Sequence, residues 1–126
     1  MVMSEPATAT HALVGIEFAL GLISAKWAVP ILRAIDAGPM RRVQIKRTLR
    51  GINDDRLDVT LHRHLRFGLV RRAWIDGPRS QEPGYELTDR GRALLDRVDA
   101  FASWDREHGD AARASAQEWD LLHPAR

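Results

Sequence analysis

The chain has 126 residues, of which 44% are hydrophobic and 29% are charged, enough for one globular domain with its own core. It contains no cysteine, which excludes disulfides, thiolate metal sites, cysteine nucleophiles and control by thiol oxidation. The sequence has no apolar run of membrane-spanning length and no stretch with the charged and apolar regions of a secretory signal. We therefore expect a cytoplasmic protein that does not enter a membrane.

The net charge of +2 hides an uneven distribution along the chain. Residues 41–75 carry ten basic side chains against three aspartates, a net +7, whereas residues 1–40 carry −1 and residues 76–126 carry −4. A basic segment of this kind is the electrostatic signature of a surface that contacts phosphates. The alternative interpretation is a solvated, arginine-rich helical face.

The first elements are a tail and two helices. Residues 1–10 have the composition of a disordered tail. Apolar residues between Leu13 and Ile23 cover much of the surface of one predicted helix, so we expect it to be buried on several sides, in part by a partner chain. A second helix is predicted from about Lys26 to Ile35 and ends before Gly38-Pro39.

Two short helices joined by a tight turn follow, which is the pattern of a helix-turn-helix. The second begins after Asn53, a good N-cap residue, and ends at Gly68. In it, Leu57 and Leu61 recur at helical spacing and predict the face turned inward. The first runs from about Arg42 to Leu49, with Val43, Ile45 and Leu49 as candidate core residues.

A β-hairpin and a long helix complete the predicted fold. Residues 69–75 and 85–87 read as two strands that flank a long polar tip, and Thr88 caps the final helix. That helix has an apolar face up to Trp104, and a more polar part follows Gly109. We predict a tail over residues 1–10, one domain over residues 11–108 and a helical extension over residues 109–126.

Short motifs, in this order, carry a likeness to a known family. They are Lys26-Trp27, Gly38-Pro39, Gly51-Ile52-Asn53, Gly68-Leu69-Val70, and Tyr85-x-Leu87-Thr88-x-x-Gly91. From about Val14 to His108 the chain resembles the HxlR family of bacterial winged-helix transcriptional regulators. The resemblance implies a mainly α fold with a small β-hairpin wing, and a homodimer formed through the first and last helices that binds double-stranded DNA.

The sequence departs from the family pattern at several positions. Val14 stands where many relatives carry a redox-sensing cysteine, so thiol switching cannot be carried over. Arg42 replaces a phenylalanine, and His64 replaces a leucine and is expected to be partly buried.

The recognition helix carries a further departure, because Asp54, Asp55 and Asp58 cluster in its first turns. Carboxylates there repel phosphates at the helix end that normally attracts them. Either an aspartate accepts a hydrogen bond from a cytosine amino group while arginines hold the backbone, or the helix has lost its DNA affinity. The candidate DNA-binding residues are Arg41, Arg42, Asn53, Asp55, Arg56, Val59, His62, Arg63, Arg66, Arg72 and Arg79.

No motif for catalysis, a cofactor or a metal is present. His62 and His64 are two residues apart on a helix and so point to different faces, which argues against a shared metal site. Four aromatic residues on the expected dimer helices, namely Phe18, Trp27, Phe101 and Trp104, offer a cleft for an aromatic effector, with plain core packing as the alternative.

These observations predict a dimeric transcriptional regulator, a repressor that binds a roughly palindromic DNA site without doing chemistry. Control by a small-molecule effector is compatible with the sequence. The alternative is a winged-helix module that has lost DNA binding and binds a small aromatic molecule or a partner protein.

Overall fold

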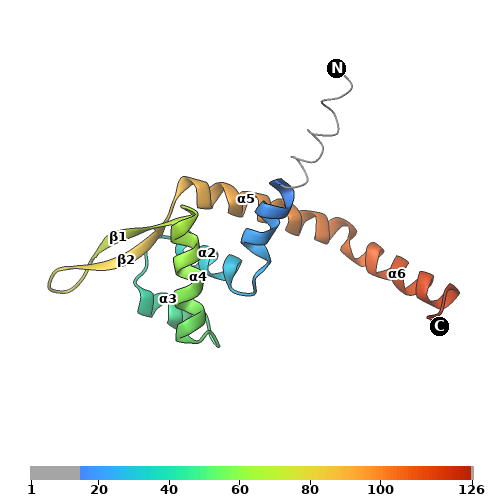
Figure 1. Cartoon of the computed structure of the whole chain (residues 1–126), viewed down its shortest axis with the longest axis horizontal. Coiled ribbons are helices and arrows are strands. Elements are labelled where there is room, and N and C mark those ends of the chain that lie inside the picture. The colour runs from blue at the N-terminus through green and yellow to red at the C-terminus, as the bar shows by residue number, and fades with distance from the viewer. Residues whose placement is uncertain (1–14, 126) are drawn as a thin grey trace, which may run out of the picture. The chain divides into compact units, whose positions relative to one another are not determined.

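The computed structural model describes residues 15–125 (Figure 1). It divides into two compact units, residues up to Arg92 and residues from Ala93 onward. A helix over Gly15–Ser24 comes first, in the region predicted from residue 13; the predicted tail and residues 11–14 lie outside the described residues. The remaining elements are α2 (Ala28–Asp36), α3 (Arg42–Thr48), α4 (Asp54–Arg66), β1 (Val70–Asp76), β2 (Gln81–Leu87), α5 (Asp89–Trp104), a π-helical turn (Asp105–Gly109) and α6 (Asp110–Leu122).

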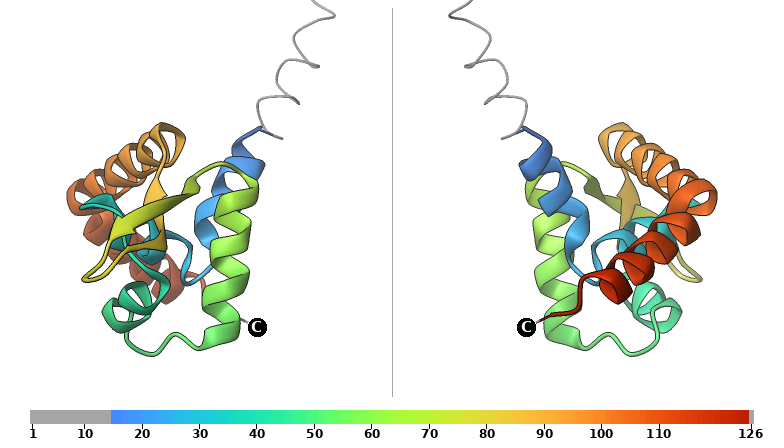
Figure 2. Two further views of the ribbon diagram at one scale, coloured as in Figure 1. Left: turned by 90° about the vertical axis from the view of Figure 1, so that its left-hand side faces the viewer. Right: turned by 90° about the vertical axis from the view of Figure 1, so that its right-hand side faces the viewer.

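The first unit is built around α2. Its buried face contributes Ile31, Leu32 and Ile35, against which Ile45 of α3 and Leu57 of α4 are also fully buried. Figure 2 shows α4 beside the helix over Gly15–Ser24, and Phe18 lies edge to face with Phe67 at the end of α4, 5.5 Å between ring centroids. The mainly α fold with a two-stranded wing is therefore confirmed.

The ends of α4 are set as the sequence predicts. Asn53 accepts a hydrogen bond from the Arg56 amide at 2.8 Å and so caps the first turn. Gly68 ends the helix with φ +70°, a conformation that costs a residue with a side chain about 1 kcal/mol. Thr88 then accepts from the Gly91 amide at 3.0 Å at the start of α5, which confirms the second predicted cap.

The wing is longer than predicted. β1 and β2 pair antiparallel from Val70 opposite Leu87 to Asp76 opposite Gln81, so only four residues form the tip. The prediction began the second strand only at Tyr85, because Pro83-Gly84 reads as a turn signal. In the structure the Tyr85 amide donates to the Met40 carbonyl at 2.8 Å, on the side away from β1. Pro83 lies two residues earlier and its nitrogen faces that same side, so no bond to β1 is lost.

The prediction that Val43 belongs to the core is wrong. Val43 is 43% exposed, while Ile45 is fully buried and Leu49 is half-buried. α3 has only seven residues, and its contact with the core is made by the face that carries Ile45. A helix of two turns that packs through one face can contact the core through a narrow apolar stripe, so Val43 need not be buried.

The second unit is one continuous helical run. A π-helical turn joins the end of α5 to α6 without a break, and the predicted boundary after His108 falls inside it. Phe101 and Trp104 are more than half exposed, and Trp119 near the end of α6 stacks on His123 with 3.7 Å between ring centroids.

Over residues 15–125, no single helix combines the length and apolar composition needed to cross a bilayer. The helices Gly15–Ser24 and Ala28–Asp36 would pass that test together, but they meet at a 75° bend.

Candidate nucleic-acid interface

The two faces of α4 differ as a recognition helix requires. Leu57, Thr60, Leu61 and His64 are buried against the first unit. The opposite face is exposed and carries four of the predicted DNA-binding residues, namely Asp55, Val59, His62 and Arg66. An exposed helical face with mixed donors, an acceptor and one apolar side chain has the chemistry that reads base edges in a major groove.

The acidic turn of α4 is largely neutralised from within the protein. Arg42 on α3 bridges Asp58 at 2.8 Å and Asp54 at 3.1 Å, and Lys46 also contacts Asp54 at 2.7 Å. The pKa of Asp54 is lowered by its bonds to Lys46 and Arg42, and the pKa of Arg42 is raised chiefly by its bond to Asp58. The charges of Asp54 and Asp58 are therefore compensated within the protein, which reduces their repulsion of a DNA phosphate.

Asp55 stands apart from this cluster. It is exposed on α4, and among residues 15–125 no ion pair or hydrogen bond is made to its carboxylate. Of the three aspartates it is thus the one available to a base.

Three of the predicted DNA-binding arginines have partners in the protein. Arg42 holds the acidic turn, Arg41 pairs with Glu82 of the wing at 2.6 Å, and Arg63 donates to the Gly21 carbonyl at 2.8 Å. Their guanidinium groups join α3 to α4, the start of α3 to the wing, and α4 to the helix over Gly15–Ser24. Asn53 is likewise used as the cap of α4.

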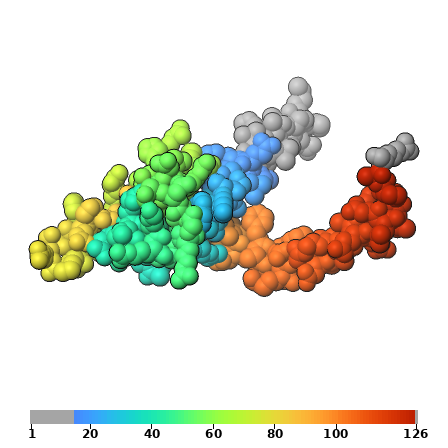
Figure 3. Space-filling model, turned by 90° about the horizontal axis from the view of Figure 1, so that it is seen from below, coloured from blue at the N-terminus to red at the C-terminus, as the bar shows by residue number. Residues whose placement is uncertain are grey.

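The other predicted arginines have no carboxylate partner in the described part of the chain. Arg66 lies over the Phe67 ring at 5.3 Å and Arg72 over the Tyr85 ring at 5.9 Å, both with exposed side chains. Arg56 on α4 and Arg79 at the wing tip are exposed. In Figure 3 the wing extends beyond α3 and α4 within the first unit. Cations that no carboxylate holds are the ones that can neutralise phosphates.

His64 is fully buried rather than partly buried. Its Nε2 donates to the Ala28 carbonyl at 2.9 Å, which ties α4 to α2, and its Nδ1 has no hydrogen-bond partner in the described residues. Burial lowers the pKa of the ring, more than the bond to Ala28 raises it. A neutral imidazole therefore replaces the leucine of the family pattern.

The four aromatic residues of the predicted cleft belong to two units, Phe18 and Trp27 to the first and Phe101 and Trp104 to the second. Phe101 and Trp104 line a hollow of about 600 Å³ along α5 in the second unit, together with Arg97 and Ala100. In the first unit, Phe18 packs on Phe67 and Trp27 lines a separate, smaller hollow.

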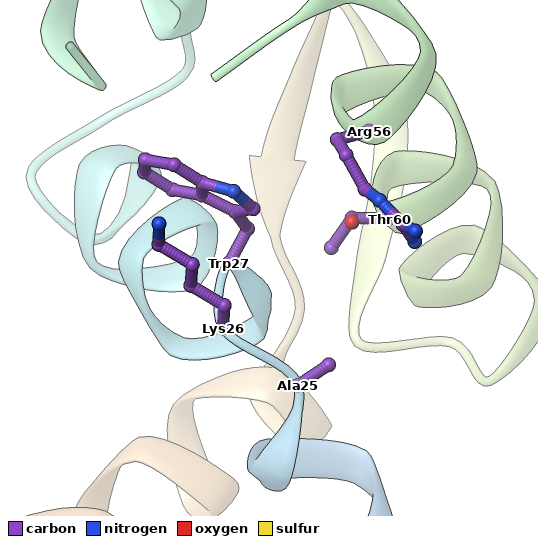
Figure 4. Close-up of a pocket in the computed structure, with 5 residues that line it drawn as sticks. All are labelled: Ala25, Lys26, Trp27, Arg56 and Thr60. Carbon is purple, nitrogen blue, oxygen red and sulfur yellow. The ribbon is translucent and has the colours of Figure 1, made fainter. Parts of the chain in front are cut away.

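That smaller hollow was not foreseen as a site. It has a volume of about 280 Å³ and is lined by Ala25, Lys26, Trp27, Arg56 and Thr60, and we call it the Trp27 notch (Figure 4). Its residues come from the turn before α2 and from α4, more than 25 positions apart in the sequence. Helical spacing from Leu57 could have predicted that Thr60 faces inward. No local sequence pattern predicts that Lys26 and Arg56 line the same hollow.

The helix-turn-helix and the wing lie within a segment that matches a known family. The profile of the HxlR-like helix-turn-helix family matches residues 22–113. The chain belongs to the HxlR-like helix-turn-helix family. Among its relatives, YdzF of Bacillus subtilis, described as an uncharacterised HTH-type transcriptional regulator, is 32% identical over 74% of this chain and 85% of its own length. A second from Methanothermobacter thermautotrophicus, described in the same words, is 27% identical over 84% of this chain and 80% of its own.

Solved structures show the same fold. A provisionally named MarR-family transcriptional regulator from Enterococcus faecalis matches this HxlR-like chain with a TM-score of 0.70 and 25% identity, over 81% of this chain and 92% of that one. The redox regulator HypR in its reduced form matches with a TM-score of 0.64 and 24% identity, over 79% and 98%. Family membership makes this protein a helix-turn-helix transcriptional regulator.

Proposed function

We propose that this HxlR-like protein is a repressor that binds a roughly palindromic DNA site as a homodimer and does no chemistry of its own. The observation that carries the proposal is the division of the cations around α4. Arg42 and Lys46 neutralise the acidic turn, while Arg66 on α4 and Arg72 on the wing keep their charges unpaired by carboxylates. The protein thereby presents positive charge beside a helix on which Asp54 and Asp58 are compensated.

The dimer is proposed from apolar side chains that a single chain leaves exposed. Ile16 and Phe18 of the helix over Gly15–Ser24 are 54% and 55% exposed, and Phe101 and Trp104 of α5 are 57% and 56% exposed. Large apolar surfaces of this kind mark interaction sites. A second copy of the chain would cover them, and two-fold symmetry would place the two recognition helices in successive major grooves.

Control of the regulator must use chemistry other than that of a thiol, since the sequence has no cysteine. The hollow beside Phe101 and Trp104 is lined by one face of α5 and is open, and it offers an apolar surface that suits the flat ring of a small aromatic effector. We propose that an effector could bind in this hollow and control the regulator. The effector would then compete with the second copy of the chain for the same apolar surface.

Substitution of the unpaired arginines tests DNA binding. Arg66→Ala and Arg72→Ala are expected to weaken binding to every duplex and to reduce the slope of log affinity against log salt by about one unit each. Fluorescence anisotropy on labelled duplexes over a range of salt concentrations measures both quantities. Arg106→Ala removes one charge from the π-helical turn, outside the helix-turn-helix and the wing, and should leave the slope unchanged. An unchanged slope in both test variants would contradict these contacts.

A further inference from the structure

We infer that the Trp27 notch seats a phosphate of the DNA backbone beside the recognition helix. The inference rests on the proposed DNA binding and adds a contact on the opposite flank of α4 from the acidic turn. Arg42 and Lys46 reach α4 at Asp54 and Asp58, whereas the notch touches it at Arg56 and Thr60. The exposed face with Asp55, Val59 and His62 lies between them.

Every polar side chain in the notch can donate a hydrogen bond. Figure 4 shows Lys26 and Trp27 on one wall and Arg56 and Thr60 on the facing helix. The lining has two cations, a hydroxyl and an indole N–H, and includes no carboxylate. A lining of donors and positive charge suits an oxyanion, because each oxygen of such a group accepts.

These donors are also unused within residues 15–125. Lys26 lies over the Trp27 ring at 5.1 Å but pairs with no carboxylate, and Arg56 forms no ion pair. The Thr60 hydroxyl, on a residue only 8% exposed, has no hydrogen-bond partner there, nor has the Trp27 indole. The Thr60 hydroxyl is not one of the fully buried polar atoms, so it is open to the notch and can donate to a group bound there.

The start of α2 adds to the same field. Lys26 and Trp27 directly precede α2, whose first turn carries no acidic residue and no side-chain cap. The positive end of this nine-residue helix therefore lies next to two lining residues of the notch and has no acidic residue in its first turn.

The size of the notch selects a small group. At about 280 Å³ it lies at the lower edge of the range of about 300–1,000 Å³ typical of pockets for small molecules. Only one phosphodiester group of a DNA duplex bound along α4 would enter the notch. The rest of the duplex would stay outside the notch, so no closed pocket is needed. Arg56 is also part of the recognition helix, which places the notch where a backbone flanking the major groove would run.

The test compares charge and hydroxyl variants on a mixed-sequence duplex by fluorescence anisotropy. Lys26→Gln and Arg56→Gln should each weaken binding and reduce the salt slope by about one unit, and the double variant by about two. Thr60→Val keeps the shape and removes only the hydroxyl, so binding should weaken about fivefold with the slope unchanged. Arg106→Gln and Thr48→Val serve as matched controls on exposed residues and should behave as the wild type.

The outcomes separate this inference from the proposed function. If the wild type binds DNA and Arg66→Ala lowers the slope, but Lys26→Gln and Arg56→Gln do not, the notch is no phosphate seat and DNA binding stands. If the wild type binds no duplex, both proposals fail. A third arm titrates the DNA-free protein with inorganic phosphate at constant ionic strength. Saturable binding that is lost in Arg56→Gln, with DNA affinity unaffected, would assign the notch to a free anion and overturn the inference.

Discussion

At the scale of single residues, the buried histidine shows how one substitution links stability to pH. His64 is neutral in the folded protein because burial lowers its pKa below the ordinary value of 6.5. In the unfolded chain the ring takes up a proton as the pH falls below that value. The unfolded state then binds more protons than the folded state, so the free energy of unfolding decreases as the pH falls.

His64→Leu should remove this pH dependence. We expect the wild type to lose stability between about pH 7 and about pH 5 and the variant to lose less, because leucine does not titrate. Urea unfolding at both pH values measures the difference. His62→Leu replaces an exposed histidine on the same helix and should retain the wild-type dependence. An equal loss of stability in wild type and His64→Leu would show that another group is responsible.

Substitution of Asp55 tests most directly whether α4 distinguishes one DNA base pair from another. Its carboxylate is not held by Arg42 or Lys46, unlike that of Asp54. Asp55→Ala should change the ranking of duplexes that differ at one base pair, by about 1–3 kcal/mol at the position it reads. Competition binding against a set of single-base variants measures this ranking. A uniform gain of affinity on every duplex would instead identify Asp55 as a simple repulsive charge.

The sequence predicted which face of α4 points outward but not how its acids are compensated. The spacing of Leu57 and Leu61 is local information, and it placed Asp55, Val59, His62 and Arg66 correctly on the exposed face. The bridge from Arg42 to Asp54 and Asp58 depends on the angle between α3 and α4. The residue pattern of either helix alone does not predict the angle between them.

At the scale of elements, Thr88 joins three parts of the first unit. Its hydroxyl donates to the Gly68 carbonyl at 2.6 Å and accepts from the Gly91 amide at 3.0 Å. The end of α4, the end of the wing and the start of α5 are thereby held together. The Thr88 amide also donates to the Leu69 carbonyl at 3.1 Å.

Thr88→Val should lower the free energy of unfolding by about 1–2 kcal/mol, since a cap and a second hydrogen bond are lost at nearly constant volume. Chemical denaturation at neutral pH measures the change. Thr48→Val is the matched control, because the Thr48 hydroxyl bonds only within α3, to the Gln44 carbonyl. A change below about 0.5 kcal/mol at Thr88 would contradict its role as a junction.

Element boundaries were predicted well where side chains act locally and poorly where they act through space. Asn53, Gly68 and Thr88 set helix ends by their own chemistry, and each stands where the sequence placed it. The second wing strand was predicted to begin only at Tyr85, because Pro83-Gly84 is a local turn signal. Pro83 can pair opposite Trp74 because its nitrogen faces away from β1. This orientation is determined only by the assembled hairpin and its bonds to Met40.

At the scale of the whole molecule, the exposed aromatic residues on α5 lead to a prediction about assembly. Phe101→Glu is expected to raise the dissociation constant of the dimer by about tenfold or more, because burying a phenylalanine contributes about 1.5–3 kcal/mol and a buried charge opposes association. Sedimentation velocity over a range of concentrations measures this. Trp74→Glu changes an aromatic residue of the wing that is 69% exposed and should leave the dimer intact. A wild type that stays monomeric throughout would contradict the proposed dimer.

The central claim is that this HxlR-like chain binds DNA through α4 and the wing, and a gel shift with the DNA upstream of its own gene tests it most directly. We expect a shift that is strong at low salt, weaker at moderate salt and stronger on the upstream DNA than on a mixed-sequence duplex of equal length. The absence of a shift at either salt concentration would contradict the claim and favour a winged-helix module that binds another partner.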